Sequence, residues 1–156
     1  DVIILTSPVY VYHCTGSMKA WLDHYGYRWM LHRPNPDMFS KQGVCISTAA
    51  GDGTKWTNKD MADSMFFWGM GKIYRYGTAV HAINYKSISP EKMAEIEKAT
   101  DKLAEKIRKN YGHVKPVLKT KTYFEVMRKL VKSGWNEVDV AYWKEHGWTE
   151  KARPWR

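Results

Sequence analysis

Three short segments of the chain carry the apolar, β-branched pattern of buried strands. Residues 2–6 read Val-Ile-Ile-Leu-Thr and end at Ser7-Pro8, residues 43–48 form a second apolar run, and residues 73–83 are rich in β-forming residues. Short apolar runs bounded by turn residues are typical of strands that are covered on both faces of a parallel sheet. The pattern therefore predicts three strands.

Helical spacing of apolar residues follows the first two strands. After the first strand, Thr15 or Ser17 can cap a helix that continues until Pro34 ends it. After the second strand, Thr57 and Asp60 have the spacing of a capping box, which predicts that a second helix begins there. Each helix is expected to turn its apolar face to the sheet.

The third predicted strand is followed by the strongest helix signal in the chain. Ser89-Pro90-Glu91 combines an N-cap residue, a proline at the first helical position and an acid in the first turn. The helix is expected to end near Gly112. Its predicted buried stripe consists of Met93, Ile96, Leu103 and Ile107.

Two short helices are predicted beyond a connector that follows residue 112. Thr122 with Glu125, and Asn136 with Asp139, have the spacing of capping boxes. The strands and helices before them alternate, and parallel neighbouring strands need such crossover connections. We therefore predict a doubly wound α/β domain over residues 1–112 and a helical C-terminal extension over residues 113–156.

Composition limits the possible classes of protein. The 156 residues are enough for one buried domain, and no apolar run approaches the length of ~20 residues that spans a bilayer. Cys14 and Cys45 are the only cysteines, and their spacing suggests neither a metal site nor a disulfide framework. We expect a cytoplasmic protein without a membrane segment or a metal.

The formal net charge is +9, and much of the excess lies late in the chain. Residues 102–132 contain ten Lys and Arg but only Glu105 and Glu125 as acids. A nucleic-acid surface is one interpretation of this segment. No nucleic-acid fold signature accompanies it, and the solvated faces of amphipathic helices account for many of these charges. Attraction of a dinucleotide phosphate is a third interpretation.

Two loops are expected at the carboxyl ends of the first two strands, where open α/β sheets bind ligands. The first, residues 7–16, combines Tyr10 and Tyr12 with apolar neighbours. The second, residues 48–56, contains Gly51 and Gly53, which allow a close approach of the backbone. Aromatic and apolar surface beside backbone donors suits a broad flat ring such as that of a flavin.

These residues also carry a family resemblance. Ser7-Pro8-Val9-Tyr10 after a buried strand, followed by Lys19-Ala20-Trp21-Leu22-Asp23, resembles the flavodoxin-like NAD(P)H-dependent FMN reductases. The Ser47-Thr48-Ala49-Ala50-Gly51 loop strengthens the likeness. The segment from Tyr142 to Trp148 is similar to the C-terminal extension of some members. The resemblance covers residues 2–111 well and the tail less closely.

The resemblance implies an FMN ring between the two loops, hydride from NAD(P)H, and a quinone, flavin or similar small molecule as acceptor. It implies a homodimer as well. No catalytic acid or base is assigned, because members of the family position donor and acceptor in turn over the flavin. The implied ring-binding residues are Pro8, Val9, Tyr10, Val11, Tyr12 and His13 in the first loop and Thr48, Ala49, Ala50, Gly51, Asp52 and Gly53 in the second.

One part of the family pattern has no counterpart here, namely the Ser/Gly-rich phosphate loop between the family's first strand and first helix. In the flavodoxin strand order 2-1-3-4-5 this chain would supply strands 3, 4 and 5. The run from Val2 to Leu5 would then be an unprotected edge. We therefore expect an N-terminally truncated domain that binds FMN weakly or not at all and is inactive by itself.

Three further interpretations stay open. His13 beside Cys14 could form a nucleophile with a base, although adjacent side chains rarely face each other and no orienting group is evident. Cys45 and Trp68 are expected to be core residues. For the whole protein, the alternatives are a basic nucleic-acid-binding α/β module and a flavodoxin-like scaffold that does not catalyse a redox reaction.

Overall fold

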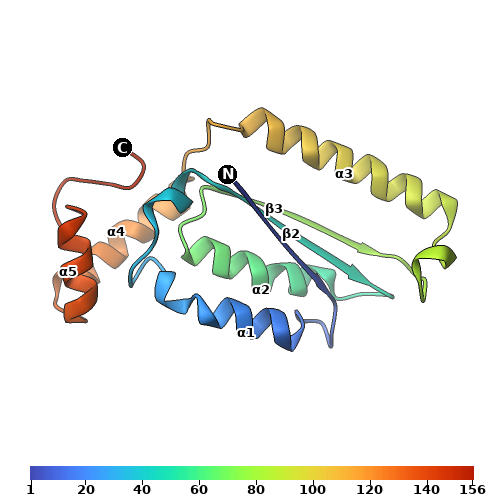
Figure 1. Cartoon of the computed structure of the whole chain (residues 1–156), viewed down its shortest axis with the longest axis horizontal. Helices are drawn as coiled ribbons and strands as arrows, with labels where there is room; N and C mark the ends of the chain where they lie inside the picture. Colours follow the sequence, from blue (N-terminus) through green and yellow to red (C-terminus); the bar gives the residue numbers. More distant parts are fainter.

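The computed structural model describes residues 1–156 and has a three-stranded parallel sheet at its centre (Figure 1). β1 (Val2–Pro8) pairs with β2 (Gln42–Ala49), and β2 pairs with β3 (Lys72–Ala79). The strand order β1-β2-β3 follows the sequence. The three predicted strands are confirmed, although the third ends four residues before the predicted residue 83.

Helices cover both faces of the sheet. Figure 1 shows α1 (Gly16–His24) and α2 (Thr54–Phe67) on one face and α3 (Pro90–Asn110) on the other. α4 (Leu118–Lys132) and α5 (Glu137–Glu145) lie together at the end of the molecule where β2 and β3 begin. The predicted fold class is confirmed: strands and helices alternate in a flavodoxin-like doubly wound α/β arrangement.

The main core lies between the sheet and helices α1 and α2. Leu5 of β1 and Cys45 of β2 pack with Leu22 of α1 and with Met61 and Met65 of α2, and all five side chains are buried. Cys45 is a core residue, as predicted. Burial raises the pKa of its thiol to about 12, so Cys45 stays protonated at neutral pH.

Helix α3 covers the other face of the sheet, and it buries that face less completely than α1 and α2 bury theirs. Ser89 caps this helix by accepting a hydrogen bond from the backbone N–H of Lys92, which confirms the predicted start. No residue of α3 is fully buried, and Ile4 of β1 is 56% exposed. The predicted stripe is therefore only half-buried, at Met93, Ile96, Leu103 and Ile107.

α1 is shorter than the sequence predicts. Thr15 caps it as expected, since its side chain accepts a hydrogen bond from the backbone N–H of Met18. The helix ends at His24 instead of continuing to Pro34, and a 3₁₀ turn at Gly26–Arg28 follows. Glycine has a low helix propensity, which is consistent with the early end.

α2 begins earlier than the sequence predicts. Its first residue is Thr54, because Gly53 has a left-handed backbone (φ 103°) that leads the chain directly into the helix. The predicted capping box of Thr57 and Asp60 is therefore wrong. Both residues lie inside α2, and both contact the loop that follows β1.

The two tail helices differ in how they begin. α4 starts at Leu118 without a side-chain cap, so the predicted start at Thr122 is wrong. Glu125, assigned from the sequence to that cap, instead forms an ion pair with Arg153. α5 begins as predicted, because the Asn136 side chain accepts hydrogen bonds from two backbone N–H groups in the first turn.

A second core joins the tail helices to the segment between α1 and β2. Phe124 and Trp143 of the tail pack with Met30 and Phe39, and all four are buried. The Phe124 and Trp143 rings stack with their centroids 4.7 Å apart. The indole N–H of Trp143 donates a hydrogen bond to the carbonyl of His32 over 2.6 Å. The tail is thus packed against residues far from it in the sequence.

Trp143→Ala is expected to lower the free energy of unfolding by ~3–5 kcal/mol, because it leaves a cavity and removes the donor to His32. Urea unfolding followed by circular dichroism measures this loss. Trp135→Ala is the control, because Trp135 is 65% exposed. Its effect is expected to stay within ~0.5 kcal/mol. Equal losses in both variants would contradict this account of the second core.

Candidate functional site

The parallel register brings the ends of the strands together. Pro8 at the end of β1 lies opposite Thr48 of β2, and Thr48 lies opposite Thr78 of β3. The loops that follow β1 and β2 therefore leave the sheet at the same edge. The sequence prediction that these two loops lie next to each other is confirmed.

The first loop is a tight turn between Tyr10 and His13. The backbone N–H of each residue donates to the carbonyl of the other, over 2.9 and 3.0 Å. Val11 and Tyr12 at the tip have positive φ angles of 49° and 68°. Residues other than glycine rarely adopt this backbone conformation. For a β-branched residue such as Val11 it is an outlier that stores strain.

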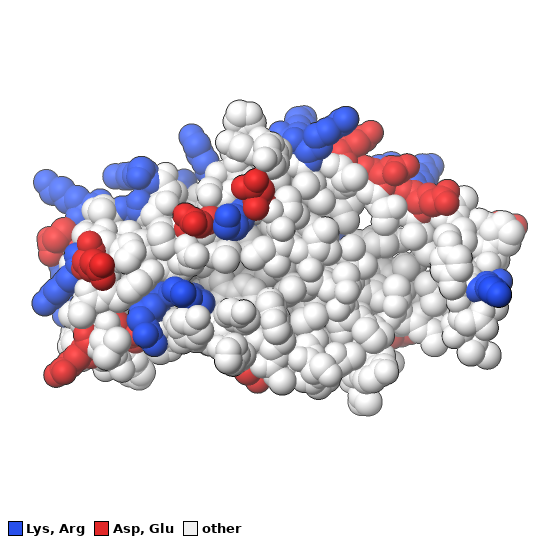
Figure 2. Space-filling model, in the orientation of Figure 1, with Lys and Arg blue, Asp and Glu red and all other residues white.

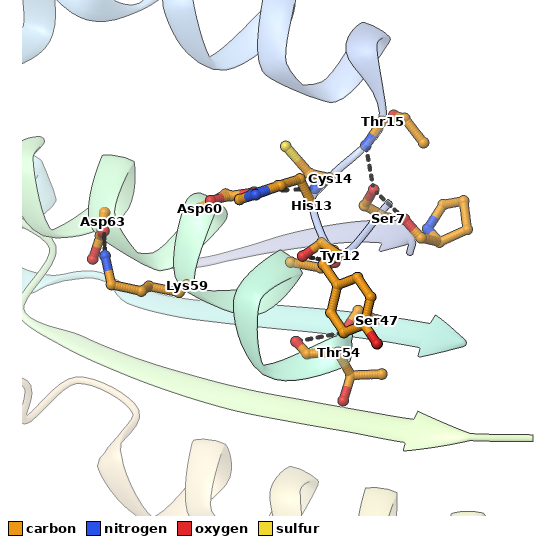
Figure 3. A network of polar contacts seen from close by, with 12 residues as sticks. Ser7, Tyr12, His13, Cys14, Thr15, Ser47, Thr54, Lys59, Asp60 and Asp63 are labelled. Carbon is orange, nitrogen blue, oxygen red and sulfur yellow. Dashed lines mark hydrogen bonds and ion pairs between the residues drawn. The ribbon is translucent and has the colours of Figure 1, made fainter. Parts of the chain in front are cut away.

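Side chains of helix α2 form hydrogen bonds with this loop. One carboxylate oxygen of Asp60 lies 3.0 Å from Nδ1 of His13 and accepts a hydrogen bond from the backbone N–H of Cys14 over 3.1 Å. The Thr57 hydroxyl makes a long contact of 3.5 Å with the carbonyl of Tyr12. Figure 3 shows Asp60 reaching from α2 to the His13 ring. The loop is therefore positioned by α2 as well as by its own turn.

Gly53 joins the second loop to the first. A Cβ at this position would lie 2.6 Å from Cγ1 of Val9 and 3.1 Å from Cα of Tyr12. Its backbone φ of 103° is also one that residues other than glycine rarely adopt. Only glycine therefore allows the two loops to pack this closely. Gly51, two residues earlier, would meet no atom within 4 Å.

A shallow cavity of about 530 Å³ opens at this edge of the sheet. This volume lies within the range of ~300–1,000 Å³ that is usual for small-molecule sites. Pro8, Val9 and Tyr10 line it from the first loop, and the run from Thr48 to Ala50 lines it from the second. A third segment completes the lining with Val80, Ala82, Ile83, Asn84, Tyr85 and Ile88.

This third segment is not among the site residues predicted from the sequence. The sequence pattern assigns the apolar residues up to Ile83 to the third strand, whereas β3 ends at Ala79 and the chain then leaves the sheet. Ile83 is fully exposed and Tyr85 is 74% exposed. The length of the apolar run could have indicated this segment. The run at residues 73–83 has eleven residues, whereas the neighbouring strand β2 has eight, so part of the run must lie outside the sheet.

Three consecutive backbone amides at the start of the second loop have no partner. Ala50, Gly51 and Asp52 are exposed, and none of their N–H groups donates a hydrogen bond within the chain. Ala50 also lines the cavity. Six of the twelve predicted site residues do not line the cavity, namely Val11, Tyr12, His13, Gly51, Asp52 and Gly53.

Cys14 is not an activated nucleophile. Burial, followed by the negative charge of Asp60, raises the pKa of its thiol. Asp60 is the orienting group for His13 that the sequence did not reveal, but its charge disfavours the thiolate. The pairing of His13 with Cys14 as base and nucleophile is therefore not supported.

Comparison with protein-family models gives a match over residues 1–84 to the NADPH-dependent FMN reductases. The matched region contains the sheet, α1, α2 and both loops. The chain belongs to this family. No curated protein matches the chain. The suspected family is thus confirmed, and membership of the NADPH-dependent FMN reductases indicates an oxidoreductase that uses FMN and a nicotinamide cofactor.

The residues at this edge of the sheet fit the ring of the cofactor of an FMN reductase. An isoalloxazine needs apolar surface for its faces and N–H donors for the edge that becomes negative on reduction. Pro8, Val9 and Tyr10 supply apolar and aromatic surface. The free amides of residues 50–52 supply donors.

The positive charge of the protein lies mainly away from this cavity. Figure 2 shows most Lys and Arg side chains of this face over the C-terminal helices and along α3, with acids among them. A cavity in the tail is lined by Lys115, Lys121, Arg153 and Arg156, together with Glu125. Nucleic-acid binding stays an untested alternative. The homodimer, the cytoplasmic location and the division at residue 112 stay predictions. None of the helices combines the length and the hydrophobicity that a membrane-spanning helix needs.

Gly53→Ala is expected to separate the two loops, because its Cβ would collide with Val9 and Tyr12 and its φ would be strained. The expected loss of stability is ~1–3 kcal/mol. Gly51→Ala is the matched control, with no atom near its Cβ. Urea unfolding of both variants measures the difference. A loss in Gly51→Ala as large as that in Gly53→Ala would contradict the close contact of the loops.

Proposed function

We propose that the protein is an FMN-dependent oxidoreductase that passes electrons from NAD(P)H through bound flavin to a quinone, a flavin or a similar small acceptor. Membership of the NADPH-dependent FMN reductases supports the reaction class. The structural observation that best supports the proposal is the apolar cavity. The backbone N–H groups next to it, at residues 50–52, have no hydrogen-bond partner within the chain.

In this proposal the two loops bind different parts of the flavin ring, one a face and the other an edge. The first loop, Pro8 to His13, supplies apolar and aromatic surface for a ring face. The second loop, Thr48 to Gly53, supplies N–H donors for the ring edge, where negative charge develops on reduction. Bound FMN supplies the redox chemistry, and these residues position it and stabilise its reduced charge.

The open shape of the cavity supports alternating use by donor and acceptor. Tyr10 is 64% exposed, and Tyr85 on the third segment is 74% exposed. Both line the cavity from segments that are far apart in the sequence. We infer that NAD(P)H and the acceptor occupy this space in turn, with the Tyr10 and Tyr85 side chains available to stack on them.

Quenching of flavin fluorescence and NADPH oxidation in the presence of excess FMN test the proposal. Tyr10→Ala is expected to weaken flavin binding by ~3–10-fold, because a lost ring contact costs ~0.5–1.5 kcal/mol. Tyr111→Ala is the control. It removes a similarly exposed tyrosine (59%) that contacts Asp1 and does not line the cavity.

The sequence predicts weak FMN binding and no activity of the chain by itself, so the test uses FMN in excess. Under that condition the proposed function requires the unaltered protein to quench FMN fluorescence and to oxidise NADPH when an acceptor is present. If it does neither with FMN in excess, the proposed function is wrong. If Tyr111→Ala weakens binding as much as Tyr10→Ala does, the assignment to this cavity is wrong. A flavin that binds without NADPH turnover would favour the scaffold that does not catalyse a redox reaction.

A further inference from the structure

Residues 80–88 supply the third part of the cavity lining and connect β3 to α3. Figure 1 shows this segment at the edge of the sheet where β2 and β3 end. The Val80 N–H donates a hydrogen bond to the Ala49 carbonyl over 2.9 Å. The His81 N–H donates to the carbonyl of Ala50 over 3.1 Å, and Ala50 begins the run of free amides. The segment is therefore fixed directly beside the proposed flavin site.

The backbone of this segment turns sharply and then forms a short 3₁₀ turn. His81 has a φ of 47°, a left-handed conformation that is uncommon for residues other than glycine. A capping box closes the turn at Tyr85–Ser87. In it the Asn84 side chain accepts the N–H of Ser87, and the Ser87 hydroxyl accepts the N–H of Asn84, each over 3.2 Å. Local hydrogen bonds thus define the backbone on both sides of Ile83.

Ile83 makes no use of its side chain within the chain. The side chain is fully exposed, yet it lines the cavity together with the half-buried Ala82 and Ile88 and the exposed Tyr85. Single exposed apolar residues are normal on a protein surface, whereas apolar residues that gather around a cavity mark a binding site. A ligand that covers Ile83 removes apolar surface from water, which favours binding in proportion to the area covered.

No charged side chain lines this cavity. All twelve lining residues are uncharged, and nine of them are hydrophobic. The tail cavity differs, because Lys115, Lys121, Arg153 and Arg156 line it. An ion that leaves water for an uncharged, apolar site finds no compensating charge there. The lining therefore favours an uncharged acceptor. The phosphates of NADPH are separated from its nicotinamide ring by a ribose and can stay in water outside an open cavity.

We propose that residues 80–88 form a subsite for an apolar side chain of the electron acceptor, with Ile83 as the specificity-determining residue. This inference rests on the proposed function and narrows its acceptor to uncharged quinones that carry an alkyl or prenyl chain. The first two loops hold the flavin, and the third segment contacts the chain of the quinone through Ile83 and Ile88.

Two quinones that differ only in the length of one alkyl group test this subsite. Methyl-p-benzoquinone and pentyl-p-benzoquinone have almost equal reduction potentials, so the ratio of their kcat/KM values reports binding of the alkyl group. With NADPH and excess FMN, the pentyl compound is expected to have about 10-fold the kcat/KM of the methyl compound. A fully buried methylene contributes up to ~4-fold, and an open site buries only part of each.

Ile83→Ser is expected to lower this ratio from about 10-fold to about 2-fold, because it removes most of the apolar contact. The variant should fold normally, since the side chain is fully exposed. Leu118→Ser is the matched control. It alters an aliphatic residue that is 79% exposed and lies at the start of α4, outside this cavity, and it should keep the ratio.

Binding is also tested without turnover. The dimethyl ether of pentylhydroquinone has the same side chain as the pentyl quinone but cannot accept electrons. Methyl NMR with excess FMN is expected to show shifts of the Ile83 and Ile88 signals as this probe is added. Ile4 is the internal control, because it is exposed on β1 and does not line the cavity. Its signal should not move.

The outcomes separate the two proposals. If the unaltered protein reduces neither quinone with FMN in excess, the proposed function fails and this inference fails with it. If it reduces both with equal kcat/KM, or if the probe shifts Ile4 as much as Ile83, this inference alone is wrong. An unchanged ratio in Ile83→Ser would overturn the role of Ile83. If sedimentation finds a dimer that Ile83→Ser dissociates, residues 80–88 are an interface between copies of the chain, and the subsite is wrong.

Discussion

Gly53 lies against Val9 and Tyr12 so closely that a methyl group on it would come within 2.6 Å of Val9. The candidate site depends on this contact, because it brings the loop after β1 and the loop after β2 to one place. The left-handed φ of Gly53 also starts α2 immediately, so that the beginning of this helix lies under the first loop. From α2, Asp60 then reaches His13 and the backbone of Cys14 (Figure 3).

The molecule separates its apolar cavity from its charged tail. The cavity lies at the carboxyl edge of the sheet, whereas α4 and α5 lie at the opposite end, as Figure 1 shows. The family match ends at residue 84, just beyond β3, and does not include the tail. The basic residues of the tail are therefore distant from the proposed flavin site. The tail packs through aromatic residues such as Trp143.

The sequence predicted the strands and the position of the two loops, because apolar runs and turn residues are local signals. It could not predict how Asp60 is used, since its spacing from Thr57 suggested a cap and only the fold brings it to His13. Nor did it predict the end of β3 at Ala79, because the length of a strand is set by its partner. The start of α4 at Leu118 has no side-chain cap, so no capping signal in the sequence could mark it.

Hydrogen–deuterium exchange with and without FMN tests the central claim most directly, because it reports which backbone amides the flavin covers. The account predicts that FMN slows exchange at residues 9–13 and 50–53, with a smaller effect at residues 80–88. It predicts no change in α4, α5 or the C-terminal residues. Slower exchange at Lys115 to Arg156 with none in the two loops would contradict it.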